Sequence, residues 1–233
     1  MITDIFSSFD PAINNTSSTM SGAIFWTLSS SMILLLFSSL WMASGRLQTL
    51  LTLPTHIMNS QLSRTFSVNL KGMMSLLTPL FIMIISVNLM GLLPYVFSSS
   101  SHLMFTLSFG LVLWLGMIMS AMVFDPYTFA ANLLPGGAPM WLNPLLVLIE
   151  TISIMVRPIT LSFRLAANMT AGHIVLTLLG AYTMTAILTS PLASMLLLPT
   201  EILYTLFEVG ICLIQAYIFC LLLSLYSDDH PSN

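Results

Sequence analysis

The chain has 233 residues, of which 57% are hydrophobic and only 6% are charged, and its mean hydropathy is +0.97. Water-soluble domains carry about 25% charged residues, so this scarcity of charge indicates that most of the solvent around the protein is lipid. The formal net charge of −3 offers no basic face for a nucleic acid. The composition therefore predicts a membrane protein.

Three apolar runs in the first half of the chain are long enough to be membrane-spanning helices. They cover residues 21–43, 72–97 and 103–124. The polar segment before them, residues 1–20, contains no Lys or Arg. A secretory leader needs a positive N-terminal region and a mitochondrial presequence needs arginines, so we expect the chain to insert through its own helices.

The segment 44–71 separates the first two runs and contains three of the five basic side chains. We predict that it lies on the membrane surface as an amphipathic helix. Under the positive-inside rule this segment faces the compartment in which the chain is made, and the N-terminus faces the other side. Residues 127–139, which include Pro135 and Gly136, are predicted to be a loop. No internal repeat is visible, so residues 1–233 are expected to form a single membrane domain.

Two longer apolar segments, 141–188 and 192–226, complete the chain. As continuous helices they would be about 72 Å and about 52 Å long, against roughly 30 Å of hydrocarbon. Each is therefore either broken into two spans or steeply tilted, and length alone leaves both alternatives open. The fold class predicted is an all-α membrane protein with about five membrane-embedded helices and one surface helix.

Charged residues are concentrated in these two segments in a regular pattern. Five of the thirteen charged side chains of the protein lie there: Glu150, Arg157, Arg164, Glu201 and Glu208. A charge at the bilayer centre costs about 2.5–3.5 kcal/mol, so they must face one another, water or a partner. The first three recur every seven residues, so they share one flank of a helix. On the second segment Glu201 and Glu208 are also seven residues apart, and the amide Gln215 follows at the same interval. Two facing helices would thus present acids and an amide opposite an arginine.

Small residues surround the last arginine of this pattern. Ala167 and Ala171 follow Arg164 on the same helical strip, together with Asn168. Small residues allow a neighbouring helix to approach closely within a membrane. His173 lies about half a turn around the helix from Arg164, on a mildly polar strip of its own.

Other common site chemistries are missing from the sequence. Cys212 and Cys220 lie eight residues apart on one predicted helix, a spacing that does not bring them together, so we interpret them as packing residues. The chain contains no GxxxxGK[ST] or GxGxxG phosphate-binding pattern and no HExxH metal motif. We therefore expect no nucleotide, metal or cofactor, and no enzymatic activity of the chain on its own.

Two stretches carry a resemblance to a known family. IETISIMVRPITLSFRLAANMTAGH (149–173) and FEVGICLIQAYIFCLLLSLY (207–226) resemble subunit a of F-type ATP synthases, in the mitochondrially encoded form of animals. DIFSSFDP (4–11) and NLMGLLPY (88–95) are similar to the same family. The resemblance extends over the whole chain. It implies that the last two helices form a steeply tilted hairpin against a rotating ring of c subunits.

The resemblance also implies a function centred on Arg164. This residue matches the arginine that faces the carboxylate of the c ring, and Asn168 and Gln215 match its polar neighbours. The chain would then be the proton-translocating stator subunit of the F0 sector. Because a guanidinium is not deprotonated in proteins, Arg164 would separate two offset proton half-channels and couple proton flow to ring rotation.

The half-channels take their titratable residues from both long helices. His173 and Glu208 match the acid–base pair of the half-channel open to the intermembrane space, and Glu150 matches the carboxylate of the half-channel open to the matrix. Glu201 lies outside the motif and is a candidate for extending the Glu208 channel toward its aqueous mouth. Arg157 also lies outside it, and we interpret it as a charge at the membrane interface or on lipid headgroups.

The same resemblance predicts the surroundings of the protein. It implies a multi-pass protein of the mitochondrial inner membrane with the c-subunit ring, the other F0 stator subunits (b, 8 and supernumerary subunits), lipid and protons as partners, and no nucleic acid or nucleotide. The alternatives are a subunit of another proton-translocating respiratory complex and a secondary transporter. A transporter normally shows repeats, and the buried basic group of such respiratory subunits is typically lysine, whereas Lys71 lies at a helix edge.

Overall fold

The structure is a computed structural model, and it describes residues 9, 27, 46–65, 68, 70, 72–93, 96, 98–134, 140–228 and 230. The described residues form helices and connecting turns without a strand, which confirms the predicted all-α fold class. The predicted first span, 21–43, and the N-terminal segment 1–20 lie outside the described residues, apart from Phe9 and Thr27.

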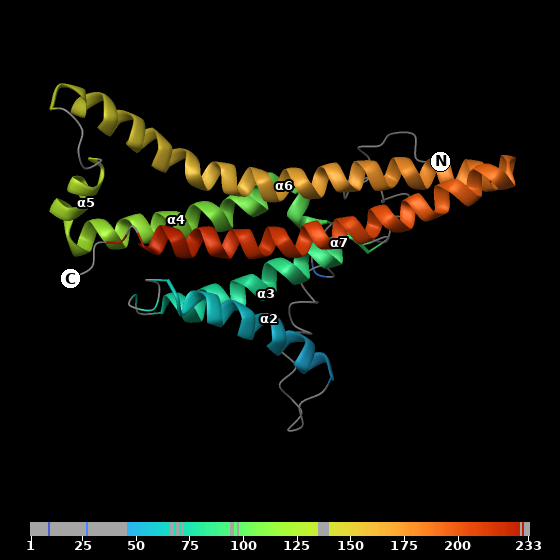
Figure 1. The fold of residues 1–233 in the computed structure, drawn as a ribbon, viewed down its shortest axis with the longest axis horizontal. Helices are drawn as coiled ribbons and strands as arrows, with labels where there is room; N and C mark the ends of the chain where they lie inside the picture. Colours follow the sequence, from blue (N-terminus) through green and yellow to red (C-terminus); the bar gives the residue numbers. More distant parts are fainter. Residues whose placement is uncertain are drawn as a thin grey trace.

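Eight helical elements follow one another along the described part of the chain. They are α2 (Arg46–Leu62), α3 (Met73–Gly91), η4 (Ser99–Ser101), α4 (Leu103–Phe124), α5 (Pro126–Asn132), η5 (Met140–Leu142), α6 (Asn143–Thr189) and α7 (Pro191–Asp228). Within the described ranges, α3, α4, α6 and α7 are long and apolar enough to cross a membrane. Figure 1 shows α6 and α7 as a long antiparallel hairpin whose connecting end extends beyond the other helices.

The long segments are each one helix, of 47 residues in α6 and 38 residues in α7. The alternative in which each is broken into two spans is therefore wrong. Pro158 lies inside α6 and Pro199 inside α7. Because an internal proline removes a backbone hydrogen bond and crowds the preceding turn, it bends a helix without ending it, and α6 is visibly curved in Figure 1.

The connection between these helices is a single extended residue. Ser190 has φ −153° and ψ 123°, and its N–H still bonds to the carbonyl of Ala186 at the end of α6. Pro191 restricts the residue before it to extended conformations and is itself suited to the first turn of a helix. The Ser-Pro pair therefore ends α6 and begins α7 with almost no loop.

Two predicted boundaries need correction. Residues 127–139 are not entirely a loop, because α5 occupies the first part of this range. The Asp125 side chain accepts hydrogen bonds from the backbone N–H groups of Tyr127 (3.1 Å) and Thr128 (3.4 Å). Asp125 thus caps α5, and Pro126 takes the first helical position. The Asp-Pro pair that ends α4 also begins the next helix.

The second predicted span is also shorter than expected, because α3 ends at Gly91 rather than near Phe97. The glycine allows a close contact at this end. A Cβ at position 91 would lie 3.1 Å from the Met169 methyl group on α6 and 3.3 Å from the Cβ of Ser98. The chain therefore turns at Gly91 so that η4 packs against α6.

The described helices bury a core where α2, α3, α6 and α7 meet. α6 packs on α7 and α4, α7 packs on α3, and α2 covers α3. The buried core cluster consists of Met58, Leu62, Leu77, Leu80, Phe81, Ile84, Leu161, Leu165, Ala216, Phe219, Cys220 and Leu223. Both cysteines are free and buried, as the packing interpretation expects. On α2, Met58 and Leu62 face this core, whereas Arg46 and His56 are exposed.

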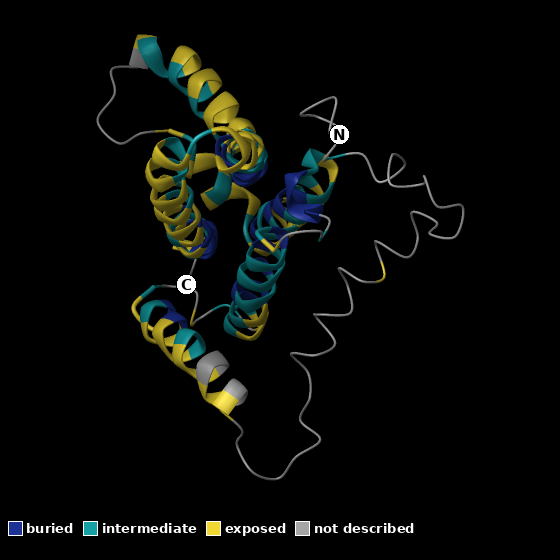
Figure 2. Ribbon diagram, turned by 90° about the vertical axis from the view of Figure 1, so that its right-hand side faces the viewer, coloured by how far each residue is buried: buried dark blue, intermediate teal, exposed yellow. Residues whose placement is uncertain are grey.

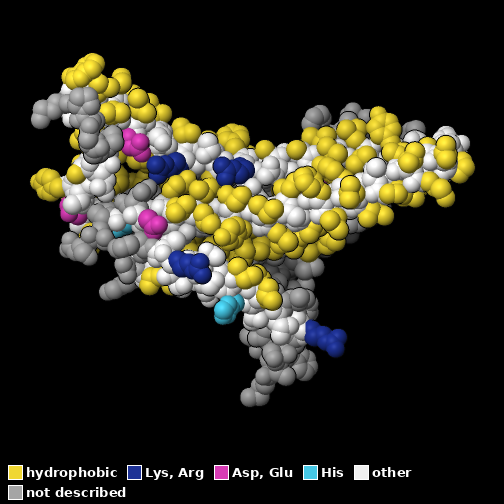
Figure 3. All heavy atoms as spheres, viewed as in Figure 1, with side chains coloured by type: hydrophobic (Ala, Val, Ile, Leu, Met, Phe, Trp, Pro, Cys, Tyr) yellow, Lys and Arg dark blue, Asp and Glu magenta, His cyan; other side chains and the backbone are white. Residues whose placement is uncertain are grey.

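The outer surface of the described helices is strongly apolar. Buried residues lie where helices meet, and exposed residues cover the outward sides (Figure 2). On the face seen in Figure 3, most charged side chains lie toward the end of the molecule opposite the hairpin connection, whereas the part of the hairpin nearer its connecting end is hydrophobic. Leu188, Leu192 and Met195 there are 85%, 77% and 76% exposed. Such a surface requires lipid or protein partners.

Candidate functional site between α6 and α7

A buried carboxylate lies at the centre of the α6–α7 interface. Glu208 on α7 is only 3% exposed and faces Gly172 on α6. A Cβ at Gly172 would lie 2.5 Å from Oε2 and 2.8 Å from Oε1 of Glu208. Tyr204 lies four residues earlier on α7, one turn away on the same side of the helix. The absent side chain of Gly172 thus creates the space in which an acidic group is held inside the hairpin.

Two amide side chains join the helices beside this acid. Asn168 Nδ2 donates a hydrogen bond of 3.1 Å to Gln215 Oε1, across 47 residues of sequence. Gln215 is 5% exposed, and its Nε2 has no hydrogen-bond partner among the described residues. A buried donor without a partner is costly. The Gln215 Nε2 group can therefore still donate a hydrogen bond to a water molecule or to another acceptor that enters the interface.

Arg164 lies on the side of α6 that α7 leaves uncovered. It is exposed, as are Thr160, Ala167 and Ala171 on the same side of the helix. Within the described part of the chain, no hydrogen bond or ion pair of the Arg164 guanidinium is found. These three neighbours are small, so the face around the guanidinium is open to an external helix.

The position of Arg164 corrects one expectation drawn from the seven-residue spacing. The two facing helices do not present their acids and amide opposite this arginine, because Glu208 and Gln215 are buried while Arg164 is exposed. Asn168 follows Arg164 by four residues, about 40° further around the helix. This offset places the amide in the interface and the guanidinium at its rim.

His173 lies next to Gly172 and is partly buried. Its Nε2 is buried and has no hydrogen-bond partner among the described residues. The imidazole makes an edge-to-face contact with the ring of Phe9, with centroids 6.1 Å apart and an interplanar angle of 89°. The structure thus places a titratable ring within one residue of the glycine that faces Glu208.

Glu201 occupies a position related to that of Glu208. It precedes Glu208 by seven residues on α7 and is partly buried. Its Oε1 would lie 3.9 Å from a Cβ at Gly180 on α6, which is an ordinary van der Waals distance. Two glycines of α6 therefore face two glutamates of α7, and the two acids lie along the same interface.

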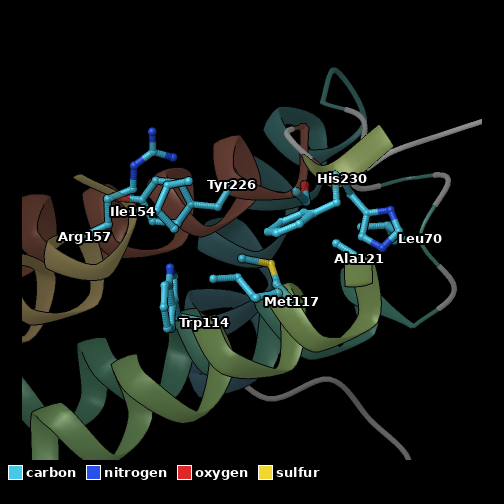
Figure 4. Close-up of a pocket in the computed structure, with 11 residues that line it drawn as sticks. Leu70, Trp114, Met117, Ala121, Ile154, Arg157, Tyr226 and His230 are labelled. Carbon is cyan, nitrogen blue, oxygen red and sulfur yellow. The ribbon is translucent and has the colours of Figure 1, made fainter. Parts of the chain in front are cut away.

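Glu150 lies nearer the start of α6, and its partner is Arg157. Arg157 Nη2 is 3.4 Å from Glu150 Oε1, and the guanidinium carbon lies 5.3 Å from the centre of the Tyr226 ring on α7. Figure 4 shows Arg157 beside Tyr226 at one end of a cavity, with His230 at the other end. Arg157 thus joins an acid to an aromatic ring, and its location at the membrane interface stays a prediction.

A second set of buried polar residues lies away from the α6–α7 interface, and it was not predicted from the sequence. Asn88 on α3 and Ser100 in η4 are each 1% exposed, and the Asn88 amide and the Ser100 hydroxyl have no hydrogen-bond partner among the described residues. Both line a cavity of about 10 Å³ together with Thr106. The signal that could have indicated the site is the single amide in the apolar run 79–93.

The part of the chain that the structure describes contains no group of three or more His, Cys, Asp or Glu side chains that could hold a metal ion.

Comparison with known proteins identifies the family. The family model for the ATP synthase A chain matches residues 19–228. The chain is 36% identical to ATP synthase subunit a of Artemia franciscana over 229 residues, which cover 98% of this chain and 100% of the relative. It is also 36% identical to ATP synthase subunit a of Locusta migratoria, covering 98% and 99% of the two chains. Identity to ATP synthase subunit a of Albinaria caerulea is 44% over 160 residues, or 67% of this chain and 72% of the relative. The polar residues buried between its two longest helices are therefore those of a multi-pass membrane protein, and the chain belongs to the ATP synthase subunit a family of the F0 sector.

Proposed function

We propose that this chain conducts protons through two offset half-channels that meet at Arg164, and that the guanidinium faces the carboxylate of a rotating c-subunit ring. The observation that carries the proposal is the placement of Arg164. It is exposed on a strip of small residues and has no ionic partner among the described residues, whereas Glu208 and Gln215 are buried in the α6–α7 interface. A charge so placed in an apolar surface needs water or a polar partner, and we infer that this partner is the carboxylate of the ring.

The Arg164 guanidinium is a permanent electrostatic barrier to proton transfer between the half-channels. Arginine stays protonated in proteins, so a hopping proton meets a fixed positive charge between the two half-channels. The same charge favours the ionised form of a carboxylate that approaches it. A protonated ring carboxylate arriving from lipid therefore releases its proton near Arg164, passes, and takes up another from the opposite half-channel. The membrane potential contributes about 2.3 kcal/mol per charge per 100 mV.

Each half-channel is assigned its own titratable residues. Glu208 and His173 serve the half-channel that opens to the intermembrane space, and Glu201 extends it along the same interface. Glu150 serves the half-channel that opens to the matrix. The proposal is supported by the distribution of these groups along α6, because Glu150 and His173 are 23 residues, or about 35 Å of helix, apart.

Location and partners follow from the same proposal. The chain spans the mitochondrial inner membrane and contacts the c-subunit ring through the Arg164 side of α6. The b, 8 and supernumerary stator subunits and lipid cover other parts of the apolar surface. ATP itself is made on other chains, so this subunit is a proton channel and not an enzyme on its own.

Disulfide cross-linking tests which side of α6 faces the ring. Ala167→Cys and Ala171→Cys, in a chain whose Cys212 and Cys220 are replaced by Ser, should each form a disulfide with a cysteine placed beside the ring carboxylate. Thr170→Cys is the matched control, because it adjoins position 171 but lies about 100° around the helix. Cross-linking at position 170 with none at 167 and 171 would contradict the proposed orientation.

A further inference from the structure

We propose that Arg157 and Tyr226 are positioning residues for Glu150. Tyr226 holds the Arg157 guanidinium from α7, and Arg157 holds the Glu150 carboxylate in the orientation in which it exchanges protons with the aqueous phase on its side of the membrane. The inference rests on the proposed function of Glu150 and extends it to two residues with no assigned role.

The first contact is within α6. Glu150 and Arg157 are seven residues apart, which places them two turns apart on one flank of the helix. The separation of 3.4 Å between Arg157 Nη2 and Glu150 Oε1 is longer than the roughly 2.7–2.9 Å of a tight charge-assisted hydrogen bond. The guanidinium therefore orients the carboxylate while leaving room for another hydrogen-bond partner.

The second contact fixes the arginine to the neighbouring helix. The Arg157 guanidinium carbon lies 5.3 Å from the centre of the Tyr226 ring, within the distance of about 6 Å at which a cation is attracted to an aromatic face. The two residues come from different helices, so this contact ties the flank of α6 that carries Glu150 to the last turns of α7. Pro158, directly after Arg157, lies where α6 lacks a backbone hydrogen bond, and a contact to α7 limits movement there.

The surroundings restrict where the guanidinium can go. Arg157 and Tyr226 line a cavity of about 60 Å³ whose other walls include Trp114, Met117 and Ile154. Figure 4 shows Trp114 and Met117 on the side of Tyr226 opposite the guanidinium. Ser227 and His230 also line the cavity. The tyrosine ring and the carboxylate are two contacts that hold Arg157 at the edge of this cavity.

The acid nevertheless remains accessible. The side chains of Arg157 and Glu150 are 30% and 39% exposed, so the ion pair is not sealed between the helices, and the proposal requires that water reaches this exposed side. An oriented carboxylate in contact with water can pass a proton, whereas a freely rotating one spends much of its time out of reach. A displacement of about 1 Å in a reacting group can lower a rate by roughly 100-fold.

The test compares substitutions in the assembled ATP synthase, with ATP synthesis driven by an imposed proton gradient. Arg157→Gln and Tyr226→Leu should each lower the synthesis rate by roughly 10-fold, because the carboxylate loses its orienting contact without being removed. Arg157→Lys and Tyr226→Phe should recover part of the rate, because a cation and an aromatic face are retained. Thr151→Ala, on an exposed residue next to Glu150, is the control and should leave the rate unchanged.

The double variant Arg157→Gln with Tyr226→Leu distinguishes a chain of contacts from two independent effects. If Tyr226 acts through Arg157, the double variant should be no slower than Arg157→Gln alone. Additive losses would overturn the inference. So would a native rate for Arg157→Gln in fully assembled complexes, or a loss that Lys does not recover and that follows the amount of assembled complex.

Glu150→Gln, measured in parallel, separates this inference from the proposed function. If Glu150→Gln is impaired and Arg157→Gln is not, the positioning role is wrong while the half-channel role of Glu150 stands. If Glu150→Gln retains the native rate, the proposed role of Glu150 is itself wrong, and the positioning role fails with it.

Discussion

Gly172 and Gly180 on α6 face Glu208 and Glu201 on α7 at very different distances. A Cβ at Gly172 would lie within 2.8 Å of both carboxylate oxygens of Glu208, whereas a Cβ at Gly180 would lie 3.9 Å from Glu201 Oε1. The first contact is closer than real Cβ atoms approach other heavy atoms, and the second is ordinary. Alanine substitutions at these two glycines therefore test whether the position of the Glu208 carboxylate matters for proton-driven ATP synthesis.

Gly172→Ala should lower proton-driven ATP synthesis by roughly 10- to 100-fold, because the methyl group displaces a reacting carboxylate. The Glu208 side chain is flexible, so assembly of the complex should persist. Gly180→Ala is the matched control and should keep a nearly native rate. Glu208→Asp combined with Gly172→Ala should recover part of the loss, since the shorter acid leaves room for the methyl group. Equal rates for the two alanine variants would show that this close contact is unimportant.

At the residue scale the sequence predicted some relationships and could not predict others. The seven-residue spacing placed Glu150 and Arg157 on one flank of a helix, and the structure joins them in an ion pair. The contact between Asn168 and Gln215 depends on how two helices align, and no spacing within one segment encodes it. Tyr226 was missed for the same reason, because its partner is on the other helix.

At the scale of elements, the two longest helices exceed the thickness of the membrane. α6 has 47 residues and α7 has 38, which correspond to about 70 Å and about 57 Å of helix. Upright, each would extend well beyond roughly 30 Å of hydrocarbon, and many of its exposed apolar side chains would lie in water. We therefore predict that both helices are steeply tilted in the membrane.

A structure of the assembled complex in which the bilayer boundaries are visible measures this tilt. Membrane helices are tilted by about 20° on average, and we expect clearly larger values for α6 and α7. Angles of less than about 25° for both helices would contradict the prediction. α4, with 22 residues, serves as an internal reference, because its length matches the bilayer without a large tilt.

Helix positions were easier to predict than helix boundaries. A long continuous apolar run between Trp141 and Leu188 predicts a helix because it contains few breaking residues. α5 was missed because Asp125 and Pro126 are typical both of the end of a span and of the start of a helix. α3 ends at Gly91, three residues before Pro94, and a proline disfavours the helical conformation in the residue before it. The local sequence therefore contained a signal for this boundary, whereas the close approach of Gly91 to α6 was not visible in it.

At the scale of the whole molecule, the main hairpin buries a few polar side chains among apolar ones and has an apolar exterior. Glu208 and Gln215 are buried, while Leu203 and Leu206 on the same helix are 71% and 72% exposed. A protein with this distribution is incomplete without lipid and partner subunits. The amino-acid composition alone predicted that lipid surrounds the protein. The surface that we propose for the ring is inferred from Arg164, whose exposure beside small residues is a property of the folded hairpin.

The central claim is that Arg164 separates the two half-channels and couples them to the ring. Arg164→Ala removes the charge, and Arg164→Lys replaces a permanent charge by a group that can lose its proton when desolvated. Thr160→Ala, one turn earlier on the same exposed side, is the control.

ATP synthesis in membranes containing the substituted chain, with the amount of assembled complex measured separately, tests this claim most directly. The account predicts no proton-driven synthesis for assembled Arg164→Ala complexes, severe impairment for Arg164→Lys, and a native rate for Thr160→Ala. An assembled Arg164→Ala complex that makes ATP at the native rate would contradict it, and the exposed arginine would then require a purely structural explanation.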